Sequence, residues 1–310
     1  MSGVIEAEGL RREFGDTVAV SDVTFTVEDG AVFALVGPNG AGKTTLLKML
    51  AALLEPTAGT ARVCGHDIQD APREVHACLG FLTDFGGLYE NLAVREYLRY
   101  FHMAYRLPAG TRSQRIDEVL SLVGLTTQAD SAIDTLSRGM RQKLSLARTL
   151  LHDPRLLLLD EPASGLDPGA RHDMQGLLRS LARRGKTIIV SSHILAELED
   201  YCSHVAILDH GSLIFAGSLE EARRSLGKGR RVRLRALSGM DDAIGILGVR
   251  KGVGDVQRLG DEASFEFQGD DAAAAELLRA LVERGVGVVS FAEAAGTIQD
   301  SYLSVMGRRP

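Results

Sequence analysis

The chain has 310 residues, enough for two domains, and 45% of them are hydrophobic, which is ample for a buried core. It contains no apolar run of eighteen residues and no basic segment followed by an apolar one at its start, so we expect neither a transmembrane helix nor a signal peptide. Its net charge of −6 argues against bulk binding to nucleic acid, and its three widely spaced cysteines are typical of a reducing compartment. The composition therefore predicts a cytosolic α/β protein.

The first informative segment is a glycine-rich loop between a strand and a helix. Residues 31–36 form an unbroken apolar run, residues 37–45 read Gly-Pro-Asn-Gly-Ala-Gly-Lys-Thr-Thr, and leucines at helical spacing follow. This order predicts a phosphate-binding loop, because backbone N–H groups and a helix N-terminus surround an anion there. We expect Lys43 to hold the β- and γ-phosphate oxygens and the Thr44 hydroxyl to ligate Mg²⁺. The residues expected to contact the nucleotide are Gly37, Pro38, Asn39, Gly40, Ala41, Gly42, Lys43, Thr44 and Thr45.

Residues 88–152 are rich in helical periodicity. Within them, Leu136-Ser137-Arg138-Gly139-Met140 precedes a helix with apolar residues on one face, and Ser137 is the expected N-cap. The amides that follow would point at an anion. Because the phosphate loop already supplies one helix N-terminus to the nucleotide, the second one indicates a site completed by another chain.

The next strands end in acidic and histidine residues. Residues 155–162 read Arg-Leu-Leu-Leu-Leu-Asp-Glu-Pro, which predicts a central buried strand with Asp160 at its C-terminal end, where it would order Mg²⁺ directly or through water. Glu161 points to the opposite side and can polarise an attacking water, so the pair favours hydrolysis over phosphotransfer. His193 follows a strand over residues 187–190. We expect its imidazole either to donate to the γ-phosphate or to hold the attacking water and Glu161 in place.

The charge balance changes near residue 225. Residues 1–222 carry a net charge of −8 and residues 223–310 a net charge of +2, so we place a boundary between domains of residues 1–224 and 225–310. Residues 223–235 hold seven basic residues and no acid, which is either a solvated strand face or a contact for anionic lipid or an acidic partner surface. A small α+β domain is predicted from strands at 231–237, 264–267 and 287–291 and a helix at 272–284.

These motifs, in this order, resemble the ATP-binding cassette (ABC) family over about residues 4–220. Residues 136–140 are similar to the family's signature sequence, residues 164–167 to its D-loop and His193 to its switch histidine. The resemblance implies an α/β fold, a P-loop NTPase parallel-sheet core with a helical subdomain at about 88–152. It also implies a head-to-tail dimer that binds two ATP molecules. Each ATP would contact the phosphate loop of one chain and, on the other chain, Ser137, Gly139 and the D-loop residue Asp167, while Phe14 would stack on the adenine.

The chain departs from the family pattern at two places. The family usually has a glutamine after the strand at 79–82, and here we expect Asp84 to coordinate or water-bridge Mg²⁺. Arg138 replaces the first glycine of the signature and Met140 its final glutamine, which is common in the exporter-type branch, the sodium- and drug-efflux ATP-binding subunits. Because Ser137 and Gly139 remain, we expect ATP hydrolysis.

The resemblance therefore implies the ATP-binding and ATP-hydrolysing subunit of a membrane exporter, located in the cytoplasm and peripheral on the inner face of the cell membrane. It would drive a separate integral-membrane permease as a homodimer, or paired with a related subunit, with no nucleic-acid partner. Two alternatives stay open. A soluble ABC-type ATPase acting on the ribosome or on DNA usually carries two cassettes or long coiled-coil arms, and a small-molecule kinase is disfavoured by the signature segment and Glu161.

Overall fold

The computed structural model describes residues 3–83, 87–194, 198, 201–226 and 230–293. By its contacts the chain divides into two compact units, residues 1–219 and 220–310. The division falls where helix α7 (Leu219–Leu226) begins, a few residues before the boundary placed from the charge balance. None of the helices in the described part of the chain has the length and hydropathy of a membrane span.

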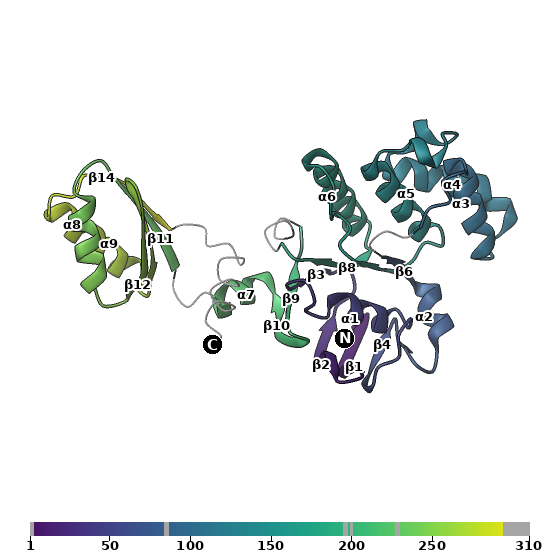
Figure 1. The fold of residues 1–310 in the computed structure, drawn as a ribbon, viewed down its shortest axis with the longest axis horizontal. Coiled ribbons are helices and arrows are strands. Elements are labelled where there is room, and N and C mark those ends of the chain that lie inside the picture. Colours follow the sequence, from purple (N-terminus) through teal and green to yellow (C-terminus); the bar gives the residue numbers. More distant parts are fainter. Residues whose placement is uncertain (1–2, 84–86, 195–197, 199–200, 227–229, 294–310) are drawn as a thin grey trace. The chain divides into compact units, whose positions relative to one another are not determined.

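The strands of the first unit form one sheet in the order β5-β4-β1-β2-β10-β9-β3-β8-β7-β6 (Figure 1). The central strands β9, β3, β8, β7 and β6 are parallel, which confirms the predicted parallel-sheet core. The strands β1, β2, β4 and β5 pair antiparallel and were missed by the sequence analysis. The strand bounds are β1 (Ile5–Phe14), β2 (Thr17–Val27), β3 (Val32–Val36), β4 (Ala58–Val63), β5 (His66–Asp67), β6 (Leu79–Leu82), β7 (Leu156–Leu159), β8 (Thr187–Ser192), β9 (His204–Asp209) and β10 (Ser212–Ser218).

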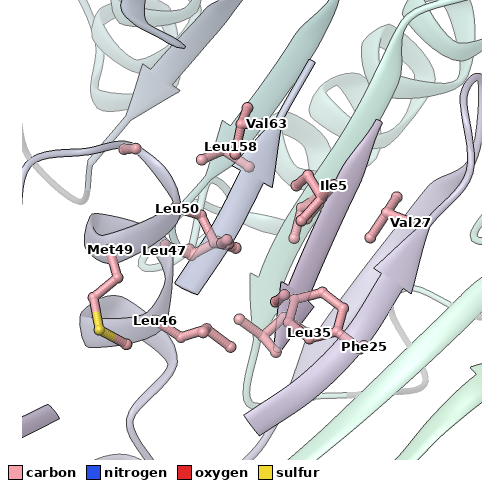
Figure 2. Close-up of a cluster of buried hydrophobic side chains, with 14 of the residues drawn as sticks. Ile5, Phe25, Val27, Leu35, Leu46, Leu47, Met49, Leu50, Val63 and Leu158 are labelled. Atoms are coloured by element: carbon pink, nitrogen blue, oxygen red, sulfur yellow. The ribbon is translucent and has the colours of Figure 1, made fainter. Parts of the chain in front are cut away.

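Helix α1 (Lys43–Leu50) lies between the parallel and the antiparallel strands (Figures 1 and 2). Its buried Leu46, Leu47 and Leu50 belong to one apolar cluster with residues of both sets of strands, among them Ile5, Phe25, Val27, Leu35, Val63 and Leu158. Burying each leucine stabilises the fold by about 1.5–3 kcal/mol. This packing holds the N-terminus of α1 against the end of β3 and so fixes the loop between them.

The remaining helices of the first unit include α2 (Pro72–Cys78), α3 (Val94–Ala104), α4 (Arg112–Val123), α5 (Arg138–Leu150) and α6 (Pro168–Arg183), with short 3-10 turns at Ala109–Thr111, Thr126–Gln128 and Ile133–Thr135. Figure 1 shows α3 to α6 on the opposite side of the parallel strands from α1. Helices α3, α4 and α5 lie within the predicted helical region at residues 88–152.

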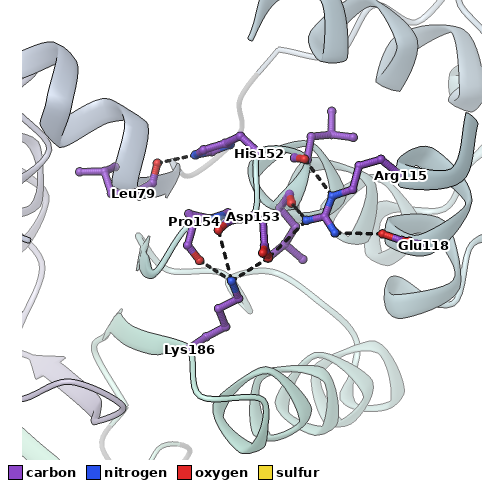
Figure 3. Close-up of polar contacts among 9 residues, drawn as sticks. Leu79, Arg115, Glu118, His152, Asp153, Pro154 and Lys186 are labelled. Atoms are coloured by element: carbon purple, nitrogen blue, oxygen red, sulfur yellow. Dashed lines mark hydrogen bonds and ion pairs between the residues drawn. The ribbon is translucent and has the colours of Figure 1, made fainter. Parts of the chain in front are cut away.

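Polar contacts fasten the C-terminal end of α5 to its surroundings (Figure 3). The Arg115 guanidinium on α4 donates to the carbonyls of Leu150 and Leu151 at 2.6 and 2.9 Å. Leu150 is the last residue of α5 and Leu151 is its C-cap, so neither carbonyl has a partner within the helix. The Leu150 carbonyl also accepts from the Asp153 N–H at 3.1 Å. The Nε2–H of His152 donates to the Leu79 carbonyl at 2.9 Å. The contacts join the helices to β6 of the sheet.

The second unit has the order β11 (Arg230–Ala236), α8 (Met240–Val249), β12 (Val253–Leu259), β13 (Glu262–Phe267), α9 (Asp271–Glu283) and β14 (Val288–Glu293). Its antiparallel sheet has the order β12-β13-β11-β14, the ferredoxin-like arrangement. It is the α+β unit predicted from sequence, although α8 and β12 were missed. Along β11, Val232 and Leu234 are buried while Arg233 and Arg235 are exposed.

Candidate functional site

The loop between β3 and α1 depends on its glycines. Gly40 and Gly42 have φ angles of 81° and 100°, which lie in the left-handed region that favours glycine. A Cβ on Gly42 would also overlap the Ala19 carbonyl, and one on Gly37 would overlap the Leu208 carbonyl. Gly37 and Gly42 therefore allow the loop backbone to pack closely against β9 and β2, respectively.

Lys43, at the first position of α1, lies with its side chain only 6% exposed. Its Nζ donates to the carbonyls of Gly37 at 2.7 Å and Pro38 at 3.2 Å, and lies 3.4 Å from Oε1 of Glu161. A buried ammonium needs such partners because leaving it unpaired is costly. The loop thus holds one positive charge at its centre.

Thr44, Asp160 and Ser191 form a hydrogen-bonded row beside this charge. Thr44 Oγ1 donates to Oδ2 of Asp160 at 2.7 Å, and Ser191 Oγ donates to Oδ1 of Asp160 at 2.7 Å. Asp160 and Ser191 are buried. The carboxylate is therefore held from both sides, by the phosphate loop and by the C-terminal end of β8.

Glu161 follows directly and is held in an unusual backbone conformation. Its φ is 48°, which is strained for a side chain of this size. Its backbone N–H donates to Ser191 Oγ at 2.9 Å, which satisfies the amide of this turn. Its Oε2 lies 3.0 Å from Nδ1 of His193, and its Oε1 faces Lys43. The left-handed turn directs the carboxylate away from Asp160 and towards His193.

These side chains surround one cavity of about 400 Å³. A cavity of this size with backbone amides, one ammonium and two carboxylates at its wall fits a phosphorylated ligand with a divalent cation. The cavity is lined by Ala19, Asn39, Gly40, Ala41, Gly42, Lys43, Thr44, Thr45, Asp160, Glu161, Ser164 and His193.

Six described residues predicted to contact ATP do not line this cavity. Two of them, Gly37 and Pro38, belong to the loop, where their carbonyls accept from Lys43. The other four are Ser137, Gly139, Asp167 and Phe14. Ser137 is exposed and caps α5, because its Oγ accepts from the Met140 N–H at 3.3 Å, which confirms the predicted N-cap. Gly139 is buried against Ala170. Asp167 caps α6 by accepting from the Ala170 N–H at 2.9 Å. Phe14 is 49% exposed, with the Arg12 guanidinium 4.6 Å above its ring. Asp84 lies outside the described residues.

Three residues of the site were missed by sequence reasoning. Ser191 joins Asp160 to Glu161, and Ala19 of β2 lies in the cavity wall. Ser164 also lines the cavity, although only Asp167 of residues 164–167 was predicted to contact ATP. For Ser191, the sequence indicated only a position near the C-terminal end of a parallel strand. For Ala19, which lies in a strand that was not predicted, no feature of the sequence indicated a role in the site.

The fold and the site define a P-loop nucleotide-binding protein. Residues 20–164 match the family model described as ABC transporter. Nod factor export ATP-binding protein I of Ralstonia nicotianae is 39% identical over 218 residues, which are 70% of this chain and 68% of that protein. Probable multidrug ABC transporter ATP-binding protein YbhF of Escherichia coli is 38% identical over 220 residues, which are 71% of this chain and 38% of that protein.

Solved structures agree with these relatives. One described as the ATP binding subunit of an ABC transporter is 34% identical, with a TM-score of 0.65, and covers 72% of this chain and 93% of its own. The chain therefore belongs to the ABC transporter family, as an ATP-binding subunit of the exporter type that hydrolyses ATP. No finding favours the soluble ribosome- or DNA-acting ATPase.

Proposed function

We propose that this chain is the peripheral, inner-face subunit of a membrane exporter and that it drives a separate permease by ATP-dependent closure of a homodimer or of a pair with a related subunit. The observation that carries this proposal is the set of contacts that joins Lys43, Glu161 and His193 around one cavity. The names of the relatives, which concern Nod factor export and multidrug transport, support the direction of transport.

The oxygen donors of the site fit Mg²⁺. Thr44 Oγ1 and Asp160 Oδ2 lie 2.7 Å apart beside the phosphate loop, and Mg²⁺ prefers oxygen ligands shared with substrate phosphates. When bound, the ion would neutralise charge on the phosphate oxygens. Thr44 and Asp160 are the proposed ligands, and Asp84 is proposed as a further one.

In the proposed reaction, the Lys43 ammonium binds the β- and γ-phosphate oxygens in place of Glu161, since a doubly charged phosphate is the stronger partner. Glu161 then accepts the proton of the attacking water. His193 donates its Nδ1–H to Oε2 of Glu161, which leaves Oε1 for the water. The backbone amides of Asn39 to Thr45 hold the remaining phosphate charge.

The second half of each site is proposed to come from a second chain. Ser137 is exposed at the N-terminus of α5, away from the cavity of its own chain. In the proposed dimer, Ser137, Gly139 and Asp167 contact the ATP held by the phosphate loop of the partner chain. Phe14, half-exposed on β1, stacks on the adenine of its own ATP.

The proposed surface for the permease is an aromatic cluster on the helical part of the first unit. Tyr89, Tyr100, Met103 and Tyr105 are 39–55% exposed, and ring contacts link Tyr89 and Tyr100 to Phe101. Exposed apolar groups gathered in this way are typical of protein interaction sites. A substitution of Tyr100 by Ser is expected to weaken permease binding and leave ATP binding unchanged.

The proposal is tested with Glu161→Gln. The amide cannot accept the proton of the water, so we expect ATP hydrolysis to fall by at least about a hundredfold, while binding persists and the chain accumulates as an ATP-dependent dimer in size-exclusion chromatography. Glu118→Gln, on the exposed face of α4, is the matched control and should behave as the unchanged chain. A Glu161→Gln chain with unchanged hydrolysis would contradict the proposed role of Glu161.

A further inference from the structure

Arg138 makes a contact that a glycine at the same position could not make. It is the first residue of α5 and replaces a glycine of the family's signature. Its Nη2 donates to the Ser164 carbonyl at 3.4 Å. Its guanidinium lies over Gly165, where the φ is 63° and an added Cβ would overlap the guanidinium. The side chain therefore links α5 to the turn at residues 163–167.

The reach of Arg138 is set by the packing of α5 on α6. A Cβ on Gly139 would lie 2.8 Å from the Cβ of Ala170, so the two helices are in close contact at their N-terminal ends. One turn further along, Lys143 Nζ lies 2.8 Å from Oδ2 of Asp173. These contacts hold the start of α5 close to the turn at residues 163–167, and the Arg138 side chain is long enough to reach Ser164 and Gly165 from there.

The turn in question continues directly from the proposed base. The Ser164 N–H donates to the Glu161 carbonyl at 3.0 Å, and the Leu166 N–H donates to the Ala163 carbonyl at 3.3 Å. Two hydrogen bonds through Ser164 therefore separate the Arg138 guanidinium from the backbone of Glu161. Because Glu161 has a strained φ of 48°, the orientation of its carboxylate depends on how firmly this turn is held.

We propose that Arg138 is a positioning residue that couples the two ATP sites of the dimer. It joins the Ser137 segment, which contacts the ATP of the partner chain, to Glu161, which acts on the ATP of its own chain. Capture of one ATP by Ser137 thereby orders the base of the other site, and positive cooperativity between the sites follows. The inference rests on the proposed head-to-tail dimer.

The first test is the ATP dependence of hydrolysis by the full chain. We expect a Hill coefficient above 1 for the unchanged chain and a value of about 1, with a lower kcat, for Arg138→Gly and Arg138→Ala. Arg138→Lys keeps one donor and should restore part of the cooperativity. Lys143→Ala, which removes a polar contact between α5 and Asp173 of α6, is the matched control and should leave the Hill coefficient unchanged.

The second test needs no turnover and reads the contact itself. In hydrogen–deuterium exchange of the full chain, Arg138→Gly should speed exchange of the amides at 164–166 at least about threefold relative to Lys143→Ala. Unchanged exchange overturns the inference.

Two kinetic outcomes also overturn it. One is a Hill coefficient of 1 in the unchanged chain, and the other is an unchanged coefficient in Arg138→Gly. In the second case, a higher half-saturating ATP concentration would indicate that Arg138 contacts the partner's phosphate directly. If Glu161→Gln still forms an ATP-dependent dimer in these cases, the proposed function stands and only the role of Arg138 fails.

Discussion

Replacing Ser191 by alanine removes one hydroxyl that serves both acidic residues of the site. Ser191 Oγ donates to the buried Asp160 carboxylate at 2.7 Å and accepts from the Glu161 N–H at 2.9 Å. Without it, a buried charged acceptor and a backbone donor both lose a partner, and each loss costs about 1–3 kcal/mol. We expect Ser191→Ala to lower the free energy of unfolding by about 2–6 kcal/mol in total.

The same change should also lower catalysis, because the Ser191 hydrogen bond holds Glu161 at its strained φ. A barrier higher by about 1.4 kcal/mol or more reduces kcat at least tenfold. Urea unfolding and steady-state ATPase assays measure the two effects. The matched control is Ser192→Ala on the same strand, where Oγ contacts only the backbone of Ile194 among the contacts described, at 3.0 and 3.3 Å. Equal losses in the two variants would refute the reasoning.

Three further changes have definite expected outcomes. Gly42→Ala should weaken ATP binding and destabilise the fold by about 1–3 kcal/mol, since the φ of Gly42 is 100° and an added Cβ would overlap a carbonyl. Gly40→Ala, with open space around the added Cβ, should weaken ATP binding less. Calorimetric titration with ATP compares the two variants. Arg115→Ala should lower the unfolding free energy by about 1–3 kcal/mol in urea, because the Leu151 carbonyl loses the Arg115 donor and the Leu150 carbonyl keeps only the Asp153 N–H. Arg99→Ala, exposed on α3, should change it little. Burial and the nearby Arg112 and Arg115 lower the pKa of His102 below its usual range. The unfolded chain therefore takes up the proton first, and stability falls as the pH drops below about 6.5. His102→Gln should flatten this dependence in unfolding curves from about pH 7 to 5.

The parts of the site carried by local sequence were predictable. The phosphate loop could be predicted because its backbone requires glycine at position 42, where the φ is 100° and a Cβ would overlap a carbonyl. The apolar segments on either side identified β3 and α1. Asp160 and Glu161 were predictable because four consecutive leucines identify β7 and its end.

The missed parts depend on register and on irregular strands. Ser191 reaches Asp160 because β7 and β8 pair with Leu159 opposite Val190, and nothing in the local sequence states that register. Strand β1 was missed because register shifts between Ala7 and Leu10 break its alternation of apolar and polar residues. The contact of Arg138 with the turn at 163–167 likewise depends on how α5 packs on α6.

The central claim is that ATP hydrolysis by this chain drives a membrane permease. The most direct measurement is a pull-down of the Glu161→Gln chain with Mg-ATP from detergent-solubilised membranes of its source cell, compared with the same chain carrying Tyr100→Ser as well. We predict recovery of a polytopic membrane protein at near-equal stoichiometry and less of it with Tyr100→Ser. Recovery of ribosomes or DNA-associated proteins, with no membrane partner, would contradict the claim.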